Sequence, residues 1–198
     1  MSAADDRALA QRTRILDAAQ ICFEKSGFHC GSMATIAQTA EMSAGLIYRY
    51  FENKNAIILA IIASQLEIIR QRIRDLRAAE DLGAGLLDYF DSQCDPARQQ
   101  ISVALFLEMS AEATRDPEIA QAVREFDETI LAEFTDWLSR SPEKGGFGLS
   151  EDIAAERALG LICLIEGLKV RKARNPDLDR ALLKKAIDAS LTNFVLQL

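Results

Sequence analysis

The sequence has few residues that interrupt helices. Its 198 residues include only 10 glycines and 4 prolines, and so few breakers favour helices over many short strands. Hydrophobic residues make up 49% of the chain, which is enough to bury a core in one domain or in two small ones. We therefore predict an all-α protein.

Histidine and paired cysteines are also scarce. His29 is the only histidine, and the four cysteines lie far apart with no CxxC pair: Cys22, Cys30, Cys94 and Cys163. A zinc site needs several thiolates or imidazoles with close pairing, so we expect no metal and no cofactor. The cysteines are expected to be reduced thiols that mostly fill small spaces in the core. A redox or soft-metal sensor that uses these thiols is the alternative.

Long hydrophobic runs are absent. The longest uncharged apolar runs, 56–63 and 158–165, are well short of the ~20 residues that a membrane span needs. The N-terminal stretch MSAADDRALAQR has no apolar segment of the kind found in a signal peptide. We expect a soluble, cytoplasmic protein with no membrane partner.

Excess positive charge is missing as well, since the formal net charge is −7. The imbalance is confined to one part of the chain. Residues 1–55 hold six basic and six acidic groups, whereas residues 56–198 hold 17 basic and 24 acidic groups. The neutral N-terminal part permits DNA binding through a local patch and does not demonstrate it.

The N-terminal part reads as three helices. Apolar residues between Leu9 and Phe23 form a one-sided helical stripe, and Gly27 can adopt the left-handed conformation that ends such a helix. Ser32 is the expected N-cap of a short second helix, MATIAQTA, and Ser43 that of a third helix starting at Ala44. These helices are expected to share a small core of Phe23, Ile36, Ala40, Met42, Ile47 and Phe51.

Longer helices are predicted downstream. Asn53 can cap a helix that continues to about Arg77. The later helices are expected at 82–94, 96–114, 117–140, 151–174 and 178–197, with a loop at 142–148. Pro96 and Pro117 each follow an aspartate, a pattern typical of an Asp N-cap with Pro as the first helical residue.

The third helix has the size and side chains of a DNA-reading helix. A short helix, a three-residue turn and a second short helix form a helix-turn-helix, whose second helix enters a major groove. Ile47 and Phe51 should face inward and anchor the helix. Tyrosine hydroxyls and a lysine can then reach phosphates beside the groove. Small residues at Ala44 and Gly45 let the helix N-terminus approach the duplex.

The segment IAQTAEMSAGLIYRYFENK, from Ile36 to Lys54, resembles the signature of the TetR family of transcriptional regulators. The resemblance implies a DNA-binding domain at 1–52 and a helical ligand-binding and dimerisation domain at 53–198. The residues that it assigns to DNA binding are Ser32, Met33, Ala34, Ser43, Ala44, Gly45, Leu46, Tyr48, Arg49, Tyr50 and Lys54.

This chain departs from the family pattern in the turn and on the reading face. Glu41 replaces the usual turn glycine, so either a residue with a side chain accepts an unfavourable φ or the turn differs slightly. Its carboxylate would repel phosphate unless it turns back toward Arg12 or Arg14. Because Ala34 and Ala44 carry no hydrogen-bonding atoms, we predict apolar contacts to thymine methyls, with Arg49 as the candidate for guanine.

The last two helices carry strong apolar stripes. Two such helices per chain could form a four-helix interface with a twofold mate, or they could only close the chain's own core. The candidates for dimerisation are Leu161, Leu164, Leu168, Leu183, Ile187, Leu191 and Phe194. A dimer would place two reading helices about 34–36 Å apart and would predict a palindromic operator.

The middle helices contain candidates for a ligand cavity: Phe90, Cys94, Phe106, Met109, Glu112, Phe126, Trp137 and Glu166. Buried carboxylates are costly unless paired, so Glu108, Glu112 and Glu166 should be exposed, salt-bridged, or available to a cationic or hydrogen-bonding ligand. The resemblance implies that an inducer bound in this cavity shifts the fourth helix and changes the separation of the two DNA-binding heads.

Two other classes of function compete with this interpretation. An enzyme would have to rely on Glu108 and Glu112 as its acid and base, because the chain has one histidine and no GxSxG or phosphate-binding glycine loop. A helical adaptor would use the head for protein contact. We predict a dimeric, ligand-responsive transcriptional regulator, more specifically a repressor, whose partners are double-stranded DNA, a second copy and a small-molecule inducer.

Overall fold

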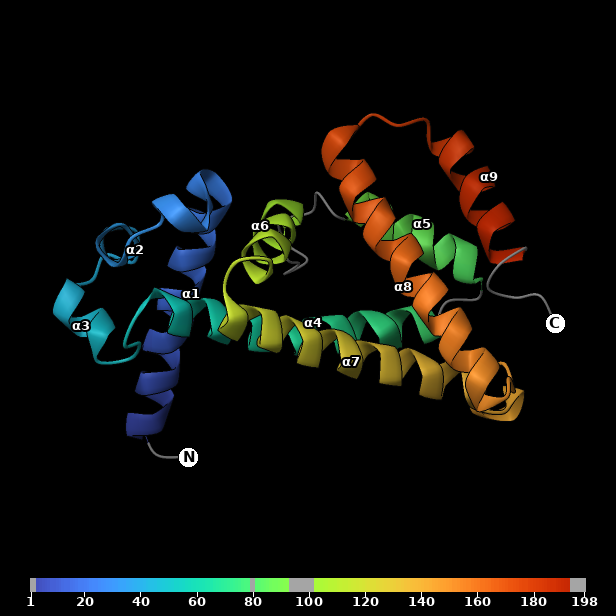
Figure 1. Ribbon diagram of the computed structural model, residues 1–198, viewed down its shortest axis with the longest axis horizontal. Coiled ribbons are helices and arrows are strands. Elements are labelled where there is room, and N and C mark those ends of the chain that lie inside the picture. Colours follow the sequence, from blue (N-terminus) through green and yellow to red (C-terminus); the bar gives the residue numbers. More distant parts are fainter. Residues whose placement is uncertain (1–2, 79–80, 93–101, 193–198) are drawn as a thin grey trace. The chain divides into compact units, whose positions relative to one another are not determined.

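The computed structural model describes residues 3–78, 81–92 and 102–192, and every regular element in these ranges is a helix (Figure 1). The all-α prediction is confirmed. The elements are α1 (Ala3–Cys30), α2 (Met33–Thr39), α3 (Ala44–Tyr48), α4 (Lys54–Ala78), α5 (Leu82–Ser92), α6 (Val103–Ala113), α7 (Pro117–Ser139), a 3₁₀ turn (Pro142–Lys144), α8 (Glu151–Arg174) and α9 (Arg180–Ser190).

The contacts divide the chain into two compact units. The first contains the residues up to Gln65 together with Ala104–Arg124, and the second contains the remaining described residues. The first unit therefore includes α1 to α3, the start of α4, nearly all of α6 and the start of α7. The predicted boundary at residue 52 stays a prediction, but the head shares its compact unit with α6.

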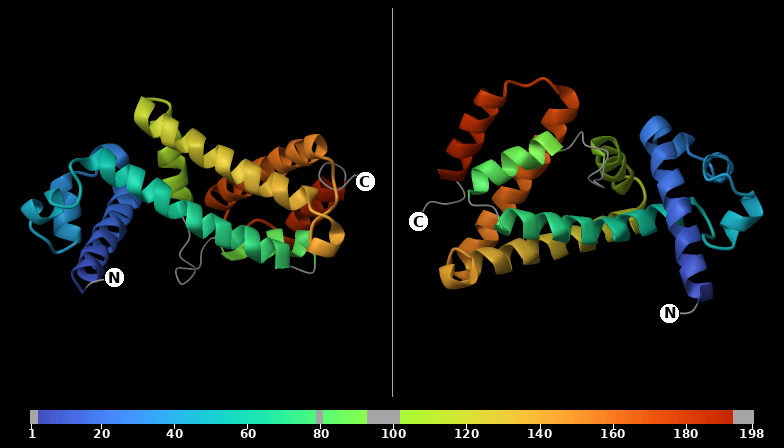
Figure 2. Two further views of the ribbon diagram at one scale, coloured as in Figure 1. Left: turned by 90° about the horizontal axis from the view of Figure 1, so that it is seen from below. Right: turned by 180° about the vertical axis from the view of Figure 1, so that it is seen from behind.

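The first unit is built around the apolar face of α1. The short helices α2 and α3 lie together on one side of α1 in each view of the molecule (Figure 2). Fully buried side chains come from α1 to α3 and from the start of α4: Ile15, Phe23, Phe28, Ile36, Ile47, Ile57, Ile58 and Ile61. Removal of this apolar surface from water is the main term that holds α2 and α3 in place, because neither of them is long enough to be stable alone.

Helix α1 is interrupted at Gly27, where the φ/ψ angles are 73° and 169°. The positive φ agrees with the prediction for this glycine, but ψ lies outside the left-handed helical region and the helix resumes after Gly27 instead of ending there. One further helical turn follows, closed by a bond from the Gly31 N–H to the Gly27 carbonyl at 3.2 Å. Position 31 also has no room for a side chain, because a Cβ there would lie 2.7 Å from the ring of Phe23.

The second unit has its own core. Helix α5 packs against both α8 and α9 (Figure 1). The core combines residues from these helices with others from the ends of α4 and α7: Ile73, Leu76, Leu86, Leu87, Phe90, Phe134, Trp137, Leu138, Leu161, Leu168, Leu183, Ile187 and Leu191. The apolar stripes of α8 and α9 thus supply the interior of the chain itself.

The predicted helix positions need two corrections. The helix expected from residue 96 begins at Val103, with Ser102 outside it, and Pro96 lies outside the described residues. The last helix begins at Arg180 rather than 178, because Asp179 caps it by accepting the Ala181 N–H at 2.8 Å. Asp116 and Pro117 start α7 as predicted, with Asp116 accepting the Glu118 and Ile119 N–H groups at 2.9 and 3.1 Å.

Candidate nucleic-acid interface

Both short helices of the head begin at the predicted serine caps. The Ser32 hydroxyl accepts the Thr35 N–H at 3.1 Å, and the Ser43 hydroxyl accepts the Leu46 N–H at 3.2 Å. Each cap satisfies a backbone N–H group that the first turn of a helix leaves without a partner. Each short helix therefore starts at a local side-chain cap, and the Ser43 cap lies at the end of the turn that leads into α3.

Helix α3 is anchored by the two residues expected to face inward. Ile47 is fully buried and Phe51 is 3% exposed. Arg12, from α1, places its guanidinium 4.4 Å from the centre of the Phe51 ring and donates to the Tyr50 carbonyl at 3.1 Å. The sequence did not reveal this bracing role of Arg12, because it depends on how α1 crosses the residues that follow α3.

The other side chains of α3 face outward. Tyr48 is 55% exposed, Ala44, Gly45 and Arg49 are exposed, and Leu46 and Tyr50 are half-buried. A Cβ added at Gly45 would meet nothing within 4 Å, so this part of α3 is open to a close approach. On α2, Ser32 and Ala34 are exposed and Met33 is half-buried. The geometry required for a reading helix is present.

Glu41 follows the first of the two alternatives that the missing turn glycine left open. Its φ is 52°, the only positive φ at a non-glycine residue in the described ranges. Its carboxylate accepts a bond from Arg14 at 3.3 Å. The side chain thus turns back toward α1, and the ion pair reduces the repulsion that a free carboxylate would exert on DNA phosphates.

Lys54 is the first residue of α4 and has a partner within the protein. Its ammonium group donates to the Phe28 carbonyl at 2.6 Å. Asn53 caps the same helix by accepting the Ala56 N–H at 2.8 Å, as predicted. A lysine ammonium has three donors, so the bond to Phe28 leaves two of them for a phosphate.

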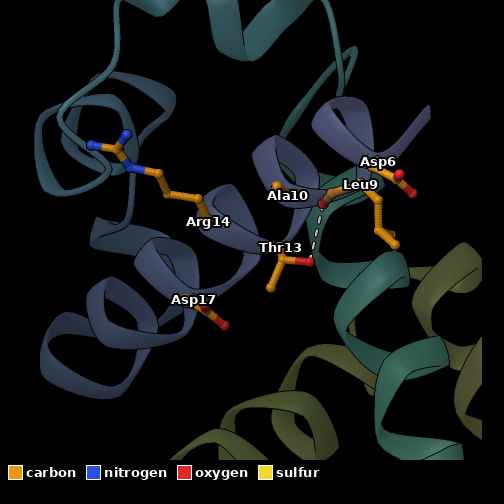
Figure 3. Close-up of a pocket in the computed structure, with 6 residues that line it drawn as sticks. All are labelled: Asp6, Leu9, Ala10, Thr13, Arg14 and Asp17. Carbon is orange, nitrogen blue, oxygen red and sulfur yellow. Dashed lines mark hydrogen bonds between the residues drawn. The ribbon is translucent and has the colours of Figure 1, made fainter. Parts of the chain in front are cut away.

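A shallow hollow lies along the outer surface of α1 (Figure 3), and it is lined by Asp6, Leu9, Ala10, Thr13, Arg14 and Asp17. All of these residues belong to one helix, and Thr13 uses its hydroxyl on the Leu9 carbonyl at 3.1 Å. Arg14 is directed away from Leu9 and Thr13 (Figure 3). The hollow is a feature of a single helix surface and does not resemble an enclosed ligand cavity.

The predicted cavity residues belong to two separate groups. Phe106, Met109 and Glu112 are in the first unit, whereas Phe90, Phe126, Trp137 and Glu166 are in the second, and Cys94 lies outside the described residues. Trp137 is 3% exposed and donates its indole N–H to the Gly145 carbonyl at 3.0 Å. Phe90 is equally buried. Their role as a ligand lining stays a prediction.

The three glutamates of the middle helices have distinct surroundings. Glu108 accepts the Phe28 N–H at 3.0 Å, and Glu112 lies 3.7 Å from His29 and 3.4 Å from Arg115. Both are therefore partnered within the first unit. Glu166 is half-buried, and its pKa is raised by burial and then by the nearby Asp127, with Lys169 acting against the shift.

Asp127 shares this environment. Desolvation raises its pKa too, and Lys169 again acts in the opposite direction, although the residue as a whole is largely exposed. Asp127 of α7 is thus close enough to Glu166 of α8 to disfavour its ionised form, and Lys169 acts against the shift at both groups. This arrangement can accept a positively charged group.

Most of the dimerisation candidates are buried in the core and are not exposed on the surface. Five of them are buried in the core of the second unit: Leu161, Leu168, Leu183, Ile187 and Leu191. Leu164 is half-buried, and Phe194 lies outside the described residues. The exposed residues of α8 and α9 are different, and they include Leu159, Gly160, Cys163, Gly167, Leu182 and Ala186. Leu159 and Leu182 are 54% and 59% exposed.

The cysteines are not gathered into one site. Cys22 is buried and lies 3.2 Å from the Thr39 hydroxyl, while Cys30 and Cys163 are exposed and free. Within the described ranges, no three His, Cys, Asp or Glu residues are grouped as a metal site would require. In the same ranges, none of the helices combines the length and the apolar character needed to cross a membrane.

Two family models match the chain. The first describes bacterial regulatory proteins of the tetR family and covers residues 15–61, which include the capped helices and the reading face. The second describes the C-terminal part of BetI-type transcriptional repressors and covers residues 70–196. Together they span most of both units.

Individual relatives agree with these models. The chain is 32% identical to the HTH-type transcriptional regulator UidR of Escherichia coli strain K12 over 136 residues, 68% of this chain and 67% of that protein. It is 25% identical to the HTH-type transcriptional repressor Rv1474c of Mycobacterium tuberculosis over 177 residues, 89% of each chain.

Solved structures share the fold. Salmonella enterica GusR matches with a TM-score of 0.72 and 28% identity, covering 93% of this chain and 96% of that one. A transcriptional regulator from Saccharomonospora viridis, solved in complex with choline, matches with a TM-score of 0.70 and 20% identity, covering 93% and 97%. The relatives are regulators and not enzymes, and this chain is a DNA-binding transcriptional regulator that belongs to the TetR family.

Proposed function

We propose that this protein is a repressor that binds a palindromic operator as a homodimer and releases it when a small molecule binds to the second unit. One observation carries the proposal: α3 is fixed from behind by Ile47 and Phe51 and presents Tyr48 and Arg49 to solvent. The repressor role is supported by the BetI-type repressor model and by the M. tuberculosis relative, which is named a repressor.

The dimer is supported by the exposed faces of α8 and α9. Isolated exposed leucines are common, but Leu159 lies beside Gly160 and Cys163 on α8, and Leu182 lies one helical turn from Ala186 on α9. A Cβ at Gly160 or Gly167 would meet nothing within 4 Å. Small residues allow a second helix to approach closely, so we infer that the mate packs against these exposed residues, in place of the buried leucines first considered.

For the inducer we propose a small organic cation. The support is the pair Glu166 and Asp127, whose carboxylates have raised pKa values that Lys169 partly offsets. A bound cation would favour the ionised form of both groups. The S. viridis regulator was solved with choline, which shows that a protein of this fold can bind such a cation.

DNA binding is tested with the DNA that flanks the protein's own gene, in a gel-shift assay run across a salt series. We expect a retarded complex whose affinity falls steeply with salt, because phosphate contacts release counterions. The control is the double variant Tyr48→Ala/Arg49→Ala, which should lose the complex while its thermal unfolding stays unchanged. A stable dimer that retards no DNA would instead favour the adaptor.

The inducer class is tested by thermal shift with choline and with its neutral isostere 3,3-dimethylbutan-1-ol. We expect choline alone to raise the melting temperature of the wild type, because a ligand that binds only the folded state stabilises it. Glu166→Gln should abolish this shift. An equal shift with the neutral isostere would contradict a cationic inducer.

A further inference from the structure

Three acidic residues on the segment from α6 to the start of α7 contact residues at the end of α1 and the start of α4. Glu108 and Glu112 are four residues apart on α6, the spacing that keeps residues on one face of a helix, and Asp116 is the residue before α7. Glu108 accepts the Phe28 N–H at 3.0 Å, Glu112 lies 3.7 Å from His29, and Asp116 accepts from Asn55 at 2.8 Å.

Glu108 makes the most specific of these contacts. The break of α1 at Gly27 starts a new helical turn at Phe28, and such a start leaves backbone N–H groups without intrahelical partners. The Glu108 carboxylate, which belongs to α6, accepts the N–H of Phe28 in α1. An N-cap side chain makes the same kind of bond, but it normally comes from the residue just before the helical turn that it caps.

Gly27 is required for this contact in two ways. Its φ of 73° favours glycine, and a Cβ at this position would lie 3.0 Å from Oε2 of Glu108. The missing side chain therefore provides the space through which the carboxylate reaches the backbone. Phe28 itself is fixed, because its side chain is 1% exposed and its ring packs edge-on against Phe23 at 4.8 Å.

Phe28 also holds Lys54. Its carbonyl accepts the Lys54 ammonium at 2.6 Å, so the N–H of one residue is bound to α6 and its carbonyl is bound to the first residue of α4. The bond fixes one of the three ammonium donors and thereby orients the other two. A shift of Phe28 would change the position of the cation expected to bind a phosphate.

We propose that Glu108 is a positioning residue for DNA binding, which acts on Lys54 through the backbone of Phe28. This inference rests on the proposed function, since it assumes that Lys54 contacts DNA. The segment Ala104–Arg124 continues into the second unit at both ends. A change that moved α6 would withdraw the carboxylate from Phe28 and loosen Lys54.

The experiment compares Glu108→Ala and Glu108→Gln with the wild type. Glu128→Ala is the matched control, because it removes the same charge from an exposed position of α7. Amide hydrogen exchange at Phe28, followed by NMR, reports on the cap directly. We expect Glu108→Ala to accelerate this exchange about tenfold, because a lost cap or charged hydrogen bond has an effect of that order. Glu108→Gln should retain part of the protection, since its amide oxygen can still accept.

The link to DNA is measured as operator affinity in a double-mutant cycle with Lys54→Met, which keeps the apolar stem and removes the ammonium. Glu108→Ala alone should weaken operator binding about tenfold, and in the Lys54→Met background it should have no further effect. Glu128→Ala should bind like the wild type. This non-additivity distinguishes action through Lys54 from a general structural defect.

Four results would overturn the proposal or its basis. Unchanged Phe28 exchange in Glu108→Ala would show that the cap is absent. Faster exchange with unchanged operator affinity, or an equal loss of affinity with and without Lys54, would show that Glu108 does not act through Lys54. A wild type that binds no operator would refute the proposed function and with it the positioning role, while the exchange result would still show whether Glu108 caps Phe28.

Discussion

Apolar patterns mark both the helix-turn-helix and the last two helices, but they lead to different conclusions about function in the two regions. In the segment Ala44–Phe51, Ile47 and Phe51 mark the buried face, and the residues proposed to contact DNA are among the others. In α8 and α9, the apolar residues themselves were assigned to the interface, and most of them are buried in the chain's own core. An apolar stripe therefore identifies the face that packs in the chain's own core. A partner can contact only the residues that remain exposed.

The largest expected effect comes from removing an anchor of α3. Phe51→Ala should lower the free energy of unfolding by about 3–5 kcal/mol, because it empties a site that is 3% exposed and removes the ring beneath Arg12. Operator binding should be lost together with stability. Urea unfolding and the gel-shift assay measure the two effects.

Tyr48→Ala provides the contrast, because this side chain is 55% exposed. Its unfolding should change by no more than about 0.5 kcal/mol, while DNA binding weakens. A similar loss of stability in both variants would mean that α3 is held by its outward face as well.

The same contrast can be drawn in α9 with two adjacent leucines. Leu183→Ala should cost about 2–5 kcal/mol of stability, because Leu183 is buried in the core of the second unit. Leu182→Glu should leave the fold intact but weaken the dimer, because it places a charge on the exposed face proposed to meet the mate. Analytical ultracentrifugation with thermal unfolding at several concentrations separates the two outcomes. A Leu182→Glu protein that stays fully dimeric would contradict the proposed face.

Arg49 and Lys54 are expected to have different roles in DNA binding, with Arg49 contacting a base and Lys54 a phosphate. Arg49→Ala should cost about 1–3 kcal/mol at one base pair of the operator and relax sequence preference there. Lys54→Ala should weaken all sequences alike and reduce the salt slope by about 1. Binding to a set of operator variants at two salt concentrations tests both. If Arg49→Ala relaxes no position, its assignment to a guanine is wrong.

Glu41 allows a smaller test within the head. Glu41→Gly should stabilise the protein by roughly 1 kcal/mol, because a non-glycine residue in the left-handed region costs about 1–2 kcal/mol and an exposed ion pair such as that with Arg14 returns less. Operator affinity should rise as well, since the helix-turn-helix loses a negative charge that the ion pair with Arg14 offsets only in part. Thermal unfolding and gel shift measure the two changes, and a destabilised variant would show that the Arg14 pair outweighs the strain.

Local chemistry explains which parts of the site could be predicted from the sequence. The caps at Ser32 and Ser43, the positive φ at Gly27 and the inward position of Ile47 depend on residues within a few positions of each other. At Glu41 the missing glycine left two alternatives, an unfavourable φ or a different turn, and the structure has the first.

Contacts between distant segments could not be predicted in this way. The Phe28 N–H meets Glu108 across 80 positions, and Arg12 meets the Tyr50 carbonyl across 38. Both pairings depend on how helices cross, and helix periodicity does not encode this. The four-residue spacing of Glu108 and Glu112 indicated a shared face, but it could not indicate that the face is turned toward the end of α1.

The smallest expected effects concern two carboxylates with opposite pH dependence, one in each unit. Backbone N–H groups and Asn55 lower the pKa of Asp116, so its contribution to stability is present above the unfolded-state pKa and is lost as pH falls through the folded value. Burial and Asp127 raise the pKa of Glu166, so the folded protein loses stability as pH rises from the ordinary carboxyl pKa through the raised one.

Asp116→Asn should therefore be less stable than the wild type at neutral pH, and the difference should vanish in acid. Glu166→Gln should be more stable than the wild type at neutral pH, with a difference that also closes as pH falls below the ordinary carboxyl range. Thermal unfolding of the three proteins between neutral and acidic pH measures both differences. Because the two variants each remove one carboxylate, any general effect of net charge has the same sign in both, and only the local surroundings can make their effects opposite.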